Sequence, residues 1–303
     1  MQILVDRKED PMLYPDTTHR LETVFEHGRL PTLVYINKQN HTRKAIRRPL
    51  HRHDSICELL FVYQGTGTYY VNGKSYPLSE GSVIYYNQGD LHEVISETEH
   101  EIGDYCIGIS NLRRCDLPPG CLISPGEPSV RQAGSLYPML LSMCEQMYTL
   151  EGTNDEGKLA AQLLCSAIIV LTSQLESFPL TGAKESDEAH MVLRIRNYLN
   201  EHFMEDITLD TAGEALGCSA TYISHIFKKA TGRTPIQYII RRRIGHAQTL
   251  LISTDYSVTR IAAIVGYDNT NYFSTIFSKV VGMSPARYRE FYKEEMKGLK
   301  DQS

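Results

Sequence analysis

Short runs rich in valine, isoleucine and tyrosine fill the chain between Thr32 and Ser110, and polar turn residues separate them. Between two of these runs, Asn72-Gly73 is a strong signal for a two-residue hairpin. The clearest expected strands are 58–64, 68–71, 74–77, 82–86 and 92–96. Because the strands are short, closely spaced and apolar on both faces, they predict a small antiparallel barrel or jelly roll.

The hydrophobic period becomes helical after Gly134. Apolar residues recur every three or four positions from Leu136 to Leu150, and a second apolar stripe runs from Leu159 to Leu175. The polar segment 151–158 separates these two expected helices. Such a pair fits a dimer interface, which we favour, and it also fits a pair that packs on the barrel of its own chain. The stretch 179–188 then has the composition of a linker.

The last third of the chain contains an internal repeat. Gly217 recurs 49 residues later as Gly266, and Pro235 recurs 50 residues later as Pro285. Each unit predicts a helix, a tight turn and a second helix, followed by the pattern Gly-x-(Thr/Ser)-Pro-x-x-Tyr. Two such units in register are much stronger evidence for paired helix-turn-helix modules than one unit would be.

Both units meet the physical requirements of a helix-turn-helix. A small residue, Gly213 or Ala262, allows the two helices to cross closely, and Gly217 or Gly266 tolerates a left-handed turn. The expected inner anchors of the second helices are Ile223, Ile226, Phe227, Phe273, Ile276 and Phe277.

One connecting helix is expected over residues 236–251, with Arg241-Arg242-Arg243 on its surface. Ser219 and Asp268 are the expected N-caps of the two second helices. A rigid connector would hold the second helices at a fixed separation, so that they enter successive major grooves about 34 Å apart.

The second unit and its surroundings carry residues at a characteristic spacing: Ile261-Ala262, Gly266-Tyr267-Asp268, Tyr272-Phe273-Ser274, Phe277, Gly282-Met283-Ser284-Pro285 and Tyr288-Arg289. With them, residues 189–292 resemble the DNA-binding domain of AraC/XylS-type transcription regulators. The first unit departs mildly, since Ala212-Gly213 stands where the family usually has a larger aliphatic residue and alanine. We expect that change to leave space rather than cause a clash.

Side chains that point away from the anchors are expected to contact DNA. Base contacts are expected from Ala220, Thr221, Ser224, His225, Asn269, Thr270, Asn271 and Thr275. Backbone contacts are expected from Lys228, Lys229, Arg243, Lys279 and Arg287. Four tyrosines are expected to pack instead: Tyr222, Tyr238, Tyr272 and Tyr288. Any one of the DNA candidates can also be an ordinary solvated surface residue.

The N-terminal half contains a cluster of candidate ligands. His51 and His53 are two residues apart, so on a strand both imidazoles face the same side, and Glu58 and His92 can converge from neighbouring strands. Three nitrogens and one oxygen suit a divalent transition metal. The pattern His51-x-His53-x4-Glu58 with His92 resembles the motifs of cupin barrels, and the resemblance implies that these four residues are the metal ligands.

The same cluster leaves a second use open. Three positions depart from the cupin motifs: Ala45, Asn87 and Ser96. The sensor domains of AraC-type regulators often resemble cupins without a required metal. The quartet can therefore line an effector site instead, with Tyr70 and Tyr85, or form a hydrogen-bonded network. Tyrosines offer flat apolar faces and hydroxyls that suit a carbohydrate or a derivative, our leading guess.

Composition limits the remaining choices. The 303 residues are 42% hydrophobic and 22% charged, as in a globular protein of two or three domains. Residues 189–303 carry a net charge of +4 and residues 1–188 a net charge of −9, so the C-terminal half is the one suited to DNA. The seven cysteines include no C-x-x-C pair, which indicates reduced cytoplasmic thiols. We expect neither an export signal nor a membrane helix; the candidate 159–172 is short and contains Gln162 and Ser166.

Together these features predict a two-domain protein, all-β and cupin-like at the N-terminus and all-α with two helix-turn-helix motifs at the C-terminus. The expected segments are 1–132 (effector barrel), 133–178 (dimerisation), 179–188 (linker) and 189–303 (DNA binding). We expect a cytoplasmic, effector-controlled regulator that binds double-stranded DNA as a homodimer, and RNA polymerase if it activates. The alternatives are a metal-dependent cupin enzyme with an accessory DNA-binding module and a regulator that has no effector.

Overall fold

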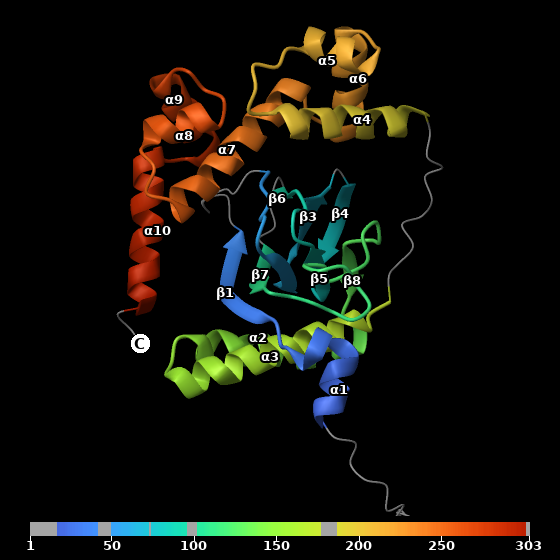
Figure 1. Cartoon of the computed structure of the whole chain (residues 1–303), viewed down its shortest axis with the longest axis vertical. Helices are drawn as coiled ribbons and strands as arrows, with labels where there is room; N and C mark the ends of the chain where they lie inside the picture. Colours follow the sequence, from blue (N-terminus) through green and yellow to red (C-terminus); the bar gives the residue numbers. More distant parts are fainter. Residues whose placement is uncertain (1–16, 42–49, 73, 96–101, 177–186, 301–303) are drawn as a thin grey trace, which may run out of the picture.

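The computed structural model describes residues 17–41, 50–72, 74–95, 102–176 and 187–300. Figure 1 shows a β-rich N-terminal half and an entirely helical C-terminal half, which lies over one end of the sheets. The predicted fold class is therefore confirmed.

The N-terminal half forms two antiparallel sheets. In the five-stranded sheet the order is β1 (Thr32–His41), β7 (Ile102–Ser110), β2 (Cys57–Gln64), β5 (Ser82–Tyr86) and β8 (Val130–Gln132). In the three-stranded sheet the order is β4 (Lys74–Ser79), β3 (Thr66–Val71) and β6 (His92–Ile95). The expected hairpin is present, because Val71 pairs with Lys74 across two residues, of which Gly73 lies outside the described residues.

The predicted barrel is not closed. The eight strands form two separate sheets, and an isolated bridge between His51 and His92 lies outside their ladders. The apolar residues on both strand faces have a different explanation. Leu60 and Val62 of β2 point into the core between the two sheets, whereas Leu59 and Phe61 point to the opposite face, which helices cover. A sheet covered on both sides needs no ring of strands to bury its two faces.

Two helices, α2 (Tyr137–Glu151) and α3 (Asp155–Ser173), cover the outer face of the five-stranded sheet (Figure 1). Their inward side chains share its core: Leu140, Cys144, Met147, Ala161, Cys165, Ile168 and Ile169. The break between them is shorter than predicted, because Asn154 caps α3 by accepting from the Gly157 amide. By length and composition α3 alone among the described helices could cross a membrane, but its buried face makes it a core helix.

Other short segments complete the N-terminal half. They are α1 (Thr17–Val24) and the 3-10 turns η1 (Glu26–Gly28) and η2 (Gly134–Leu136).

Seven helices form the C-terminal half. They are α4 (Asp187–His202), α5 (Leu209–Leu216), α6 (Ala220–Thr231), α7 (Pro235–Ser253), α8 (Val258–Ile264), α9 (Thr270–Val281) and α10 (Pro285–Lys300). The first module packs with α4 around Ile223, Ile226 and Phe227, and the second packs around Phe273 and Phe277. Helix α7 contributes to both cores and is the predicted connector. Because α4 already begins at Asp187, the expected linker is too long at its C-terminal end, and its residues 179–186 lie outside the described ranges.

Local details of the two turns confirm one expectation and correct two. Gly217 and Gly266 adopt the left-handed backbone, with φ of 71° and 86°. The N-cap of α9 is Asn269 rather than Asp268, because the Asn269 side chain accepts from the amides of Asn271 and Tyr272.

The second correction concerns space at Gly213. A Cβ there would lie 2.5 Å from the carbonyl oxygen of Cys218, so no room is left for the alanine that the family usually has. In the first module α5 and the turn before α6 approach more closely than we expected, and position 213 therefore requires glycine for steric reasons.

Candidate DNA-binding interface and sensor sites

Helices α6 and α9 occupy equivalent places in their modules, and each begins with a side-chain cap and ends at a left-handed glycine. Their inner faces are buried, which leaves the opposite face to solvent. Most predicted contact residues are exposed there: Thr221, His225, Lys228, Lys229, Asn269, Asn271, Thr275 and Lys279. Ala220, Ser224 and Thr270 are half-buried, and Arg287 is exposed on α10.

Two tyrosines on these helices were wrongly expected to pack. Tyr222 is 40% exposed and Tyr272 is 56% exposed, whereas Tyr238 and Tyr288 are buried as predicted. Tyr222 and Tyr272 are equivalent positions of the repeat, 50 residues apart, and both lie outside the apolar stripe of their helix. That shared position was the signal that could have identified them.

Two predicted contacts are already engaged within the protein. The Asn269 oxygen serves as the cap of α9, so this side chain does not present the free amide that bidentate pairing with adenine requires. Lys229 lies 2.9 Å from the Glu188 carboxylate, and this exposed pair raises the pKa of the lysine through a hydrogen bond and the negative charge.

Arg243 is not placed to bind DNA. Its guanidinium donates to the carbonyl oxygens of Phe203 (2.6 Å), Gly266 (2.7 Å) and Glu205 (2.7 Å). The side chain therefore ties α7 to two loops of the C-terminal half. The interior of the protein uses all three nitrogens, which no sequence pattern around Arg243 indicates.

The histidine and glutamate quartet comes together as predicted. His51 and His92 exchange backbone hydrogen bonds of 3.0 and 2.9 Å, which places their rings 4.3 Å apart by centroid. Glu58 extends from β2 toward the histidines, with its carboxylate 2.9 Å from His92 Nε2 and 3.5 Å from His53 Nε2. His92 Nδ1 lies 2.9 Å from the Asp90 carbonyl, which fixes the ring orientation.

Burial alone would raise the pKa of the Glu58 carboxyl. The hydrogen bond with His92 and the charges of His53, His92 and His51 outweigh burial and hold it well below its usual range. Glu58 therefore remains a carboxylate, the form that binds a cation.

The residues around the quartet are partly different from those expected. Tyr86 stacks on His92 with ring centroids 4.0 Å apart, and Tyr35 donates a hydrogen bond to Glu58. Tyr85 lies on the opposite face of β5 and donates to the Thr172 carbonyl of α3, so it cannot contact a ligand at the quartet. Tyr70 lies in the core shared with α4, away from the quartet.

The donor set fits a divalent transition metal. The four ligand atoms of His51, His53, Glu58 and His92 all lie within 4.8 Å of one another, and three of the four residues are buried. A single ion can therefore be reached by every donor after shifts of about an ångström, given metal–ligand distances near 2.1 Å. The same closeness leaves no room for an organic molecule between them.

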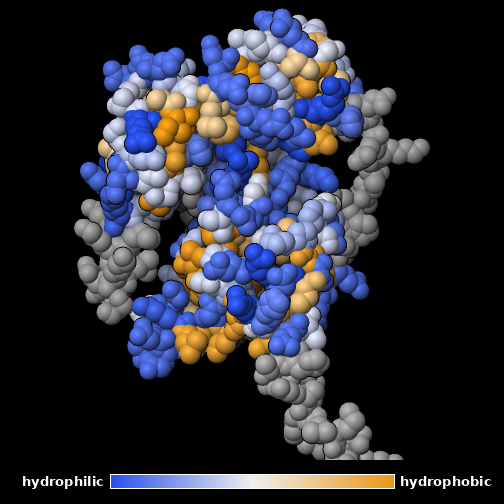
Figure 2. Space-filling model, viewed as in Figure 1, coloured by the Kyte–Doolittle hydropathy of each residue, from blue (hydrophilic) through white to orange (hydrophobic). Residues whose placement is uncertain are grey.

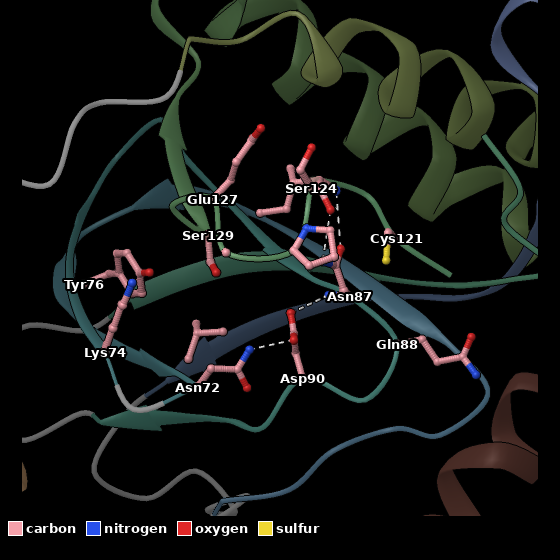
Figure 3. A pocket seen from close by; sticks show the side chains of 14 residues that line it. Asn72, Lys74, Tyr76, Asn87, Gln88, Asp90, Cys121, Ser124, Glu127 and Ser129 are labelled. Carbon is pink, nitrogen blue, oxygen red and sulfur yellow. Dashed lines mark hydrogen bonds between the residues drawn. The ribbon is translucent and has the colours of Figure 1, made fainter. Parts of the chain in front are cut away.

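A separate pocket of about 270 Å³ offers that room (Figure 3). It lies between the β3–β4 hairpin, the turn before β6 and the loop 121–129. Most of the residues that line it are polar: Asn72, Lys74, Tyr76, Asn87, Gln88, Asp90, Ser124, Glu127 and Ser129. Hydrogen bonds from Asn72 Nδ2 (2.6 Å) and from the backbone N–H of Asn87 (2.8 Å) hold the Asp90 carboxylate in place. No sequence pattern predicts this pocket, because the segments that form its walls are far apart in the chain.

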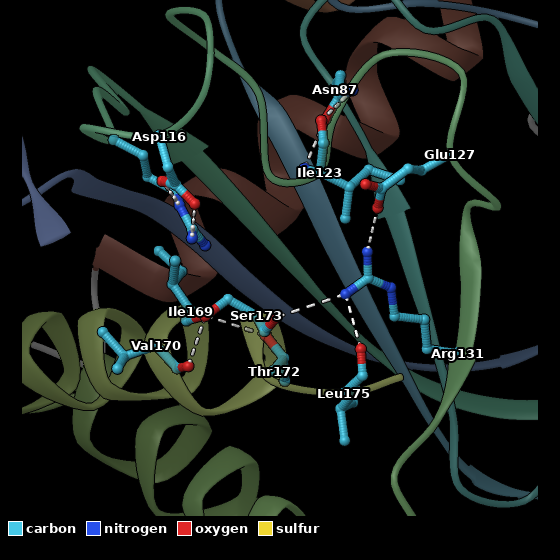
Figure 4. A network of polar contacts seen from close by, with 11 residues as sticks. Asn87, Asp116, Ile123, Glu127, Arg131, Ile169, Val170, Thr172, Ser173 and Leu175 are labelled. Carbon is cyan, nitrogen blue, oxygen red and sulfur yellow. Dashed lines mark hydrogen bonds and ion pairs between the residues drawn. The ribbon is translucent and has the colours of Figure 1, made fainter. Parts of the chain in front are cut away.

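The pocket wall is connected to α3 (Figure 4). Glu127 pairs with Arg131 of β8, and Arg131 also donates to the carbonyls of Leu175 (2.8 Å) and Ser173 (3.5 Å). A cation at these carbonyls stabilises the C-terminal end of α3. A displacement of Glu127 would therefore be transmitted to the C-terminal end of α3 through the Arg131 side chain.

Comparison with known proteins agrees with this architecture. A model of the AraC-like ligand binding domain matches residues 34–170, and a model of a helix-turn-helix domain matches residues 213–290. The HTH-type transcriptional activator RhaR of Escherichia coli (strain K12) is 28% identical over 252 residues, covering 79% of this chain and 86% of that protein. The HTH-type transcriptional regulator YdiP of the same organism is 24% identical over 277 residues, covering 90% of each chain.

Among solved structures, the C-terminal domain of AraT, a response regulator from Geobacillus stearothermophilus, is 38% identical. The match covers 35% of this chain and 88% of that one, with a TM-score of 0.34.

A β-rich ligand-binding half followed by two helix-turn-helix modules defines a DNA-binding transcription regulator with a sensor domain. The chain belongs to the AraC family of these regulators. Because its relatives are transcription regulators, the alternative of a metal-dependent enzyme is set aside.

Proposed function

We propose that the protein acts in the cytoplasm as a sequence-specific regulator that inserts α6 and α9 into successive major grooves of one DNA duplex. The observation that carries this proposal is the repeat itself. Two recognition helices with buried inner faces and exposed polar outer faces are joined by one continuous helix, α7. Such a connector fixes the spacing of the two contacts, as binding to adjacent grooves requires.

The side chains proposed to read bases lie on the exposed faces of the two helices. They are Thr221, Ser224, His225, Asn271 and Thr275, with Ala220 and Thr270 at the helix starts and the newly identified Tyr222 and Tyr272. Lys228, Lys279 and Arg287 are proposed to contact phosphates, which position the protein without reading sequence. Lys229 would have to leave Glu188 to do the same.

Selection of bound DNA from random sequence with the full-length protein tests this function. We expect an enriched motif with two elements about one helical turn apart, and Asn271→Ala should relax base preference in one of them. Glu290→Ala, an exposed change on α10, is the control. Failure to enrich any sequence at physiological salt would contradict the proposal.

The effector is proposed to bind in the polar pocket rather than at the quartet. A pocket of about 270 Å³ with amides, hydroxyls and the Lys74 ammonium suits a small polyhydroxylated molecule, of the carbohydrate class expected from the sequence. Ser124→Phe would fill the pocket, so it should abolish the response of operator affinity to such ligands while leaving basal operator binding intact. A panel of monosaccharides and their phosphates measured by calorimetry provides the probes, and an undiminished response in Ser124→Phe would exclude this pocket.

The quartet is proposed to hold a divalent transition metal. Its four donors, its size and the ionised state of Glu58 support this assignment. Elemental analysis of protein purified without chelator should give about one metal per chain, and His51→Ala should reduce it strongly. A folded, metal-free protein that also fails to bind added Zn²⁺ would exclude the site.

Dimerisation is proposed to use the solvent side of α3. Leu159 and Leu163 are exposed on it although both are large and apolar, and Figure 2 shows hydrophobic side chains gathered at the end of the molecule where α2 and α3 lie. A second copy of the chain is the partner that would cover them. If the dimer activates transcription, RNA polymerase is a further partner.

A further inference from the structure

One buried carboxylate of the sensor half is held by the DNA-binding half. Glu93 of β6 is only 1% exposed. Its Oε1 accepts a hydrogen bond from Arg233, and its Oε2 accepts from Arg241 Nε (2.9 Å) and Nη2 (2.7 Å). Arg233 precedes α7 and Arg241 lies on it, 140 and 148 residues beyond Glu93. Both carboxylate oxygens are thus used across the two halves of the chain.

Apolar contacts surround this triad. Leu50, Tyr70 and Leu91 of the sensor half share a core with α4, which contributes Ile195 and Leu199. The second module, in contrast, forms its own core, to which no described residue of the sensor half contributes a side chain. The sensor therefore holds the first module and the start of α7 (Figure 1). The second module is connected to them through α7 and through the loop after α4, where a Cβ on Gly266 would lie 2.5 Å from the Met204 carbonyl oxygen.

We propose that Glu93, Arg233 and Arg241 form a clasp that holds the DNA-binding half in a low-affinity arrangement, and that metal binding at the quartet opens the clasp. This inference rests on the proposed function. Electrostatics gives its direction, because the clasp pairs one carboxylate with two arginines and keeps the acidic sensor, net −9, against the DNA-binding half, net +4. Opening it would raise the positive potential that attracts a duplex.

The closed arrangement also carries an opposing cost. Arg242, between the clasp residue Arg241 and Arg243, is 2% exposed and lies 4.3 Å from the Phe203 ring. Its Nε and Nη1 have no hydrogen-bond partner among the described residues. Burial and, to a lesser extent, the positive charge of Arg52 in the sensor lower the pKa of Arg242 to about 10. A buried cation without full pairing destabilises the closed state, which keeps opening within reach of a ligand.

The quartet and the clasp are adjacent on one strand. His92 and Glu93 are consecutive in β6, so their side chains leave the strand on opposite faces, one toward Glu58 and the other toward the arginines. β6 is an edge strand of the three-stranded sheet; within the described residues it pairs with β3 and, through the isolated His51–His92 bridge, with the segment that carries His51. It can therefore shift together with His51 without breaking a central ladder. A metal must replace the direct 2.9 Å contact between His92 and Glu58, which displaces His92 and with it Glu93.

Operator affinity of the full-length protein tests the clasp. With DNA selected by the wild type, Glu93→Gln should bind about tenfold more tightly, a typical coupling between two sites, and should scatter as a more extended particle. Asp255→Asn, which removes the exposed ion pair with Lys293 in the second module, is the matched control and should change neither. The double variant Arg233→Gln/Arg241→Gln removes the clasp from the DNA-binding half, so this protein should also scatter as a more extended particle. Unchanged or weaker binding by a folded Glu93→Gln protein overturns the clasp; if the wild type itself selects no DNA, the proposed function fails instead.

Zn²⁺ alone tests the link to the quartet. Zn²⁺ should strengthen operator binding by the wild type. Because coupling between two sites is reciprocal, Glu93→Gln, in which the clasp is already open, should bind Zn²⁺ more tightly than the wild type. The ratio of the two Zn²⁺ affinities measures the cost of opening the clasp. His51→Ala should remove the Zn²⁺ effect. Equal Zn²⁺ affinity in wild type and Glu93→Gln, or no effect of bound Zn²⁺ on operator binding, overturns the coupling.

Discussion

Arg241, Arg242 and Arg243 are adjacent in the chain, yet their guanidinium groups lie in three different surroundings. Arg241 pairs with Glu93, Arg242 stacks on Phe203, and Arg243 donates to three backbone carbonyls. Consecutive residues on a helix point about 100° apart, so the run was never a single basic face. In this conformation none of the three presents its charge to DNA, although the run is the longest uninterrupted series of basic residues in the chain.

The surroundings of Arg243 predict a stability defect rather than a binding defect. Arg243→Met should lower the free energy of unfolding by about 2 kcal/mol, because carbonyl groups lose charged donors. Lys228→Ala, on the exposed face of α6, should leave stability unchanged and make the salt dependence of operator binding shallower by about one unit of slope. Denaturant unfolding and salt titrations of both variants separate these outcomes, and a reduced salt slope in a stable Arg243→Met protein would restore Arg243 as a DNA contact.

The cysteines allow a second prediction at this scale. Burial raises the pKa of Cys165 to about 12 and raises the pKa of Cys57 and Cys144 still further, whereas Cys115 is exposed. Because the thiolate is the reactive form, a disulfide reagent at pH 8 should modify Cys115 rapidly and the three buried thiols only on unfolding. Mass spectrometry of modified wild type and Cys115→Ser identifies the sites. Rapid labelling of Cys165 in the folded protein would contradict this burial.

Spacing predicted the quartet but not all of its neighbours. His51, His53, Glu58 and His92 were expected together because a strand alternates its faces and the four residues recur at cupin spacing. The same alternation separates Tyr85 from Tyr86, but only the pairing of Glu58 with Tyr86 reveals which of them faces the site. That pairing is a long-range register, which one sequence does not specify.

At the scale of elements, the crossing of α5 and α6 shows how a glycine can be required inside a helix. An alanine in a helix normally gains about 0.5 to 1 kcal/mol over glycine. At Gly213 a Cβ would instead lie 2.5 Å from the Cys218 carbonyl oxygen, a backbone atom that cannot move aside easily.

Gly213→Ala should therefore destabilise the first module by about 1 to 3 kcal/mol, the usual cost of overpacking. Gly152→Ala, at the end of α2, is the matched control: its Cβ would lie 3.8 Å from the nearest atom, so stability should be unchanged. Thermal or denaturant unfolding measures both. If Gly213→Ala equals the wild type, the helices of the first module cross less closely than described.

The type of each element was predictable, because the periodicity of hydrophobic residues alone distinguishes the strands of the sensor from the helices that follow. The layer arrangement was not. Apolar residues on both faces of β2 fit a closed barrel or a sheet covered by helices equally well, and the difference lies in where α2 and α3 pack. Those contacts join segments roughly 80 to 100 residues apart, as do Tyr85 and Thr172, which are 87 residues apart.

At the scale of the whole molecule, the two halves differ in net charge and in function but are held together by side-chain contacts between them. The sequence indicates the division through its opposite net charges. It does not indicate the triad of Glu93 with Arg233 and Arg241, since an isolated glutamate in a strand and two arginines near a helix start have no pattern that connects them. The face of α3 that remains exposed likewise becomes visible only after its other face is buried against the sheet.

That exposed face carries the last prediction. Leu159 and Leu163 are 59% and 51% exposed and lie one helical turn apart, so they form one apolar strip that a second copy can cover. Leu159→Arg/Leu163→Arg would place two like charges in the interface, so it should convert dimer to monomer in analytical ultracentrifugation. Because the DNA-binding half is untouched, the variant should still bind one half-site but lose its preference for paired half-sites.

Leu21→Arg is the matched control, because Leu21 is a 38% exposed leucine of the sensor half that lies on α1. It should leave both the assembly and the paired-site preference unchanged. If the double variant remains dimeric, α3 faces solvent alone and another surface must join the subunits. If it becomes monomeric but keeps its preference for paired half-sites, DNA itself brings the two subunits together, and the contact through α3 adds nothing to the choice of operator.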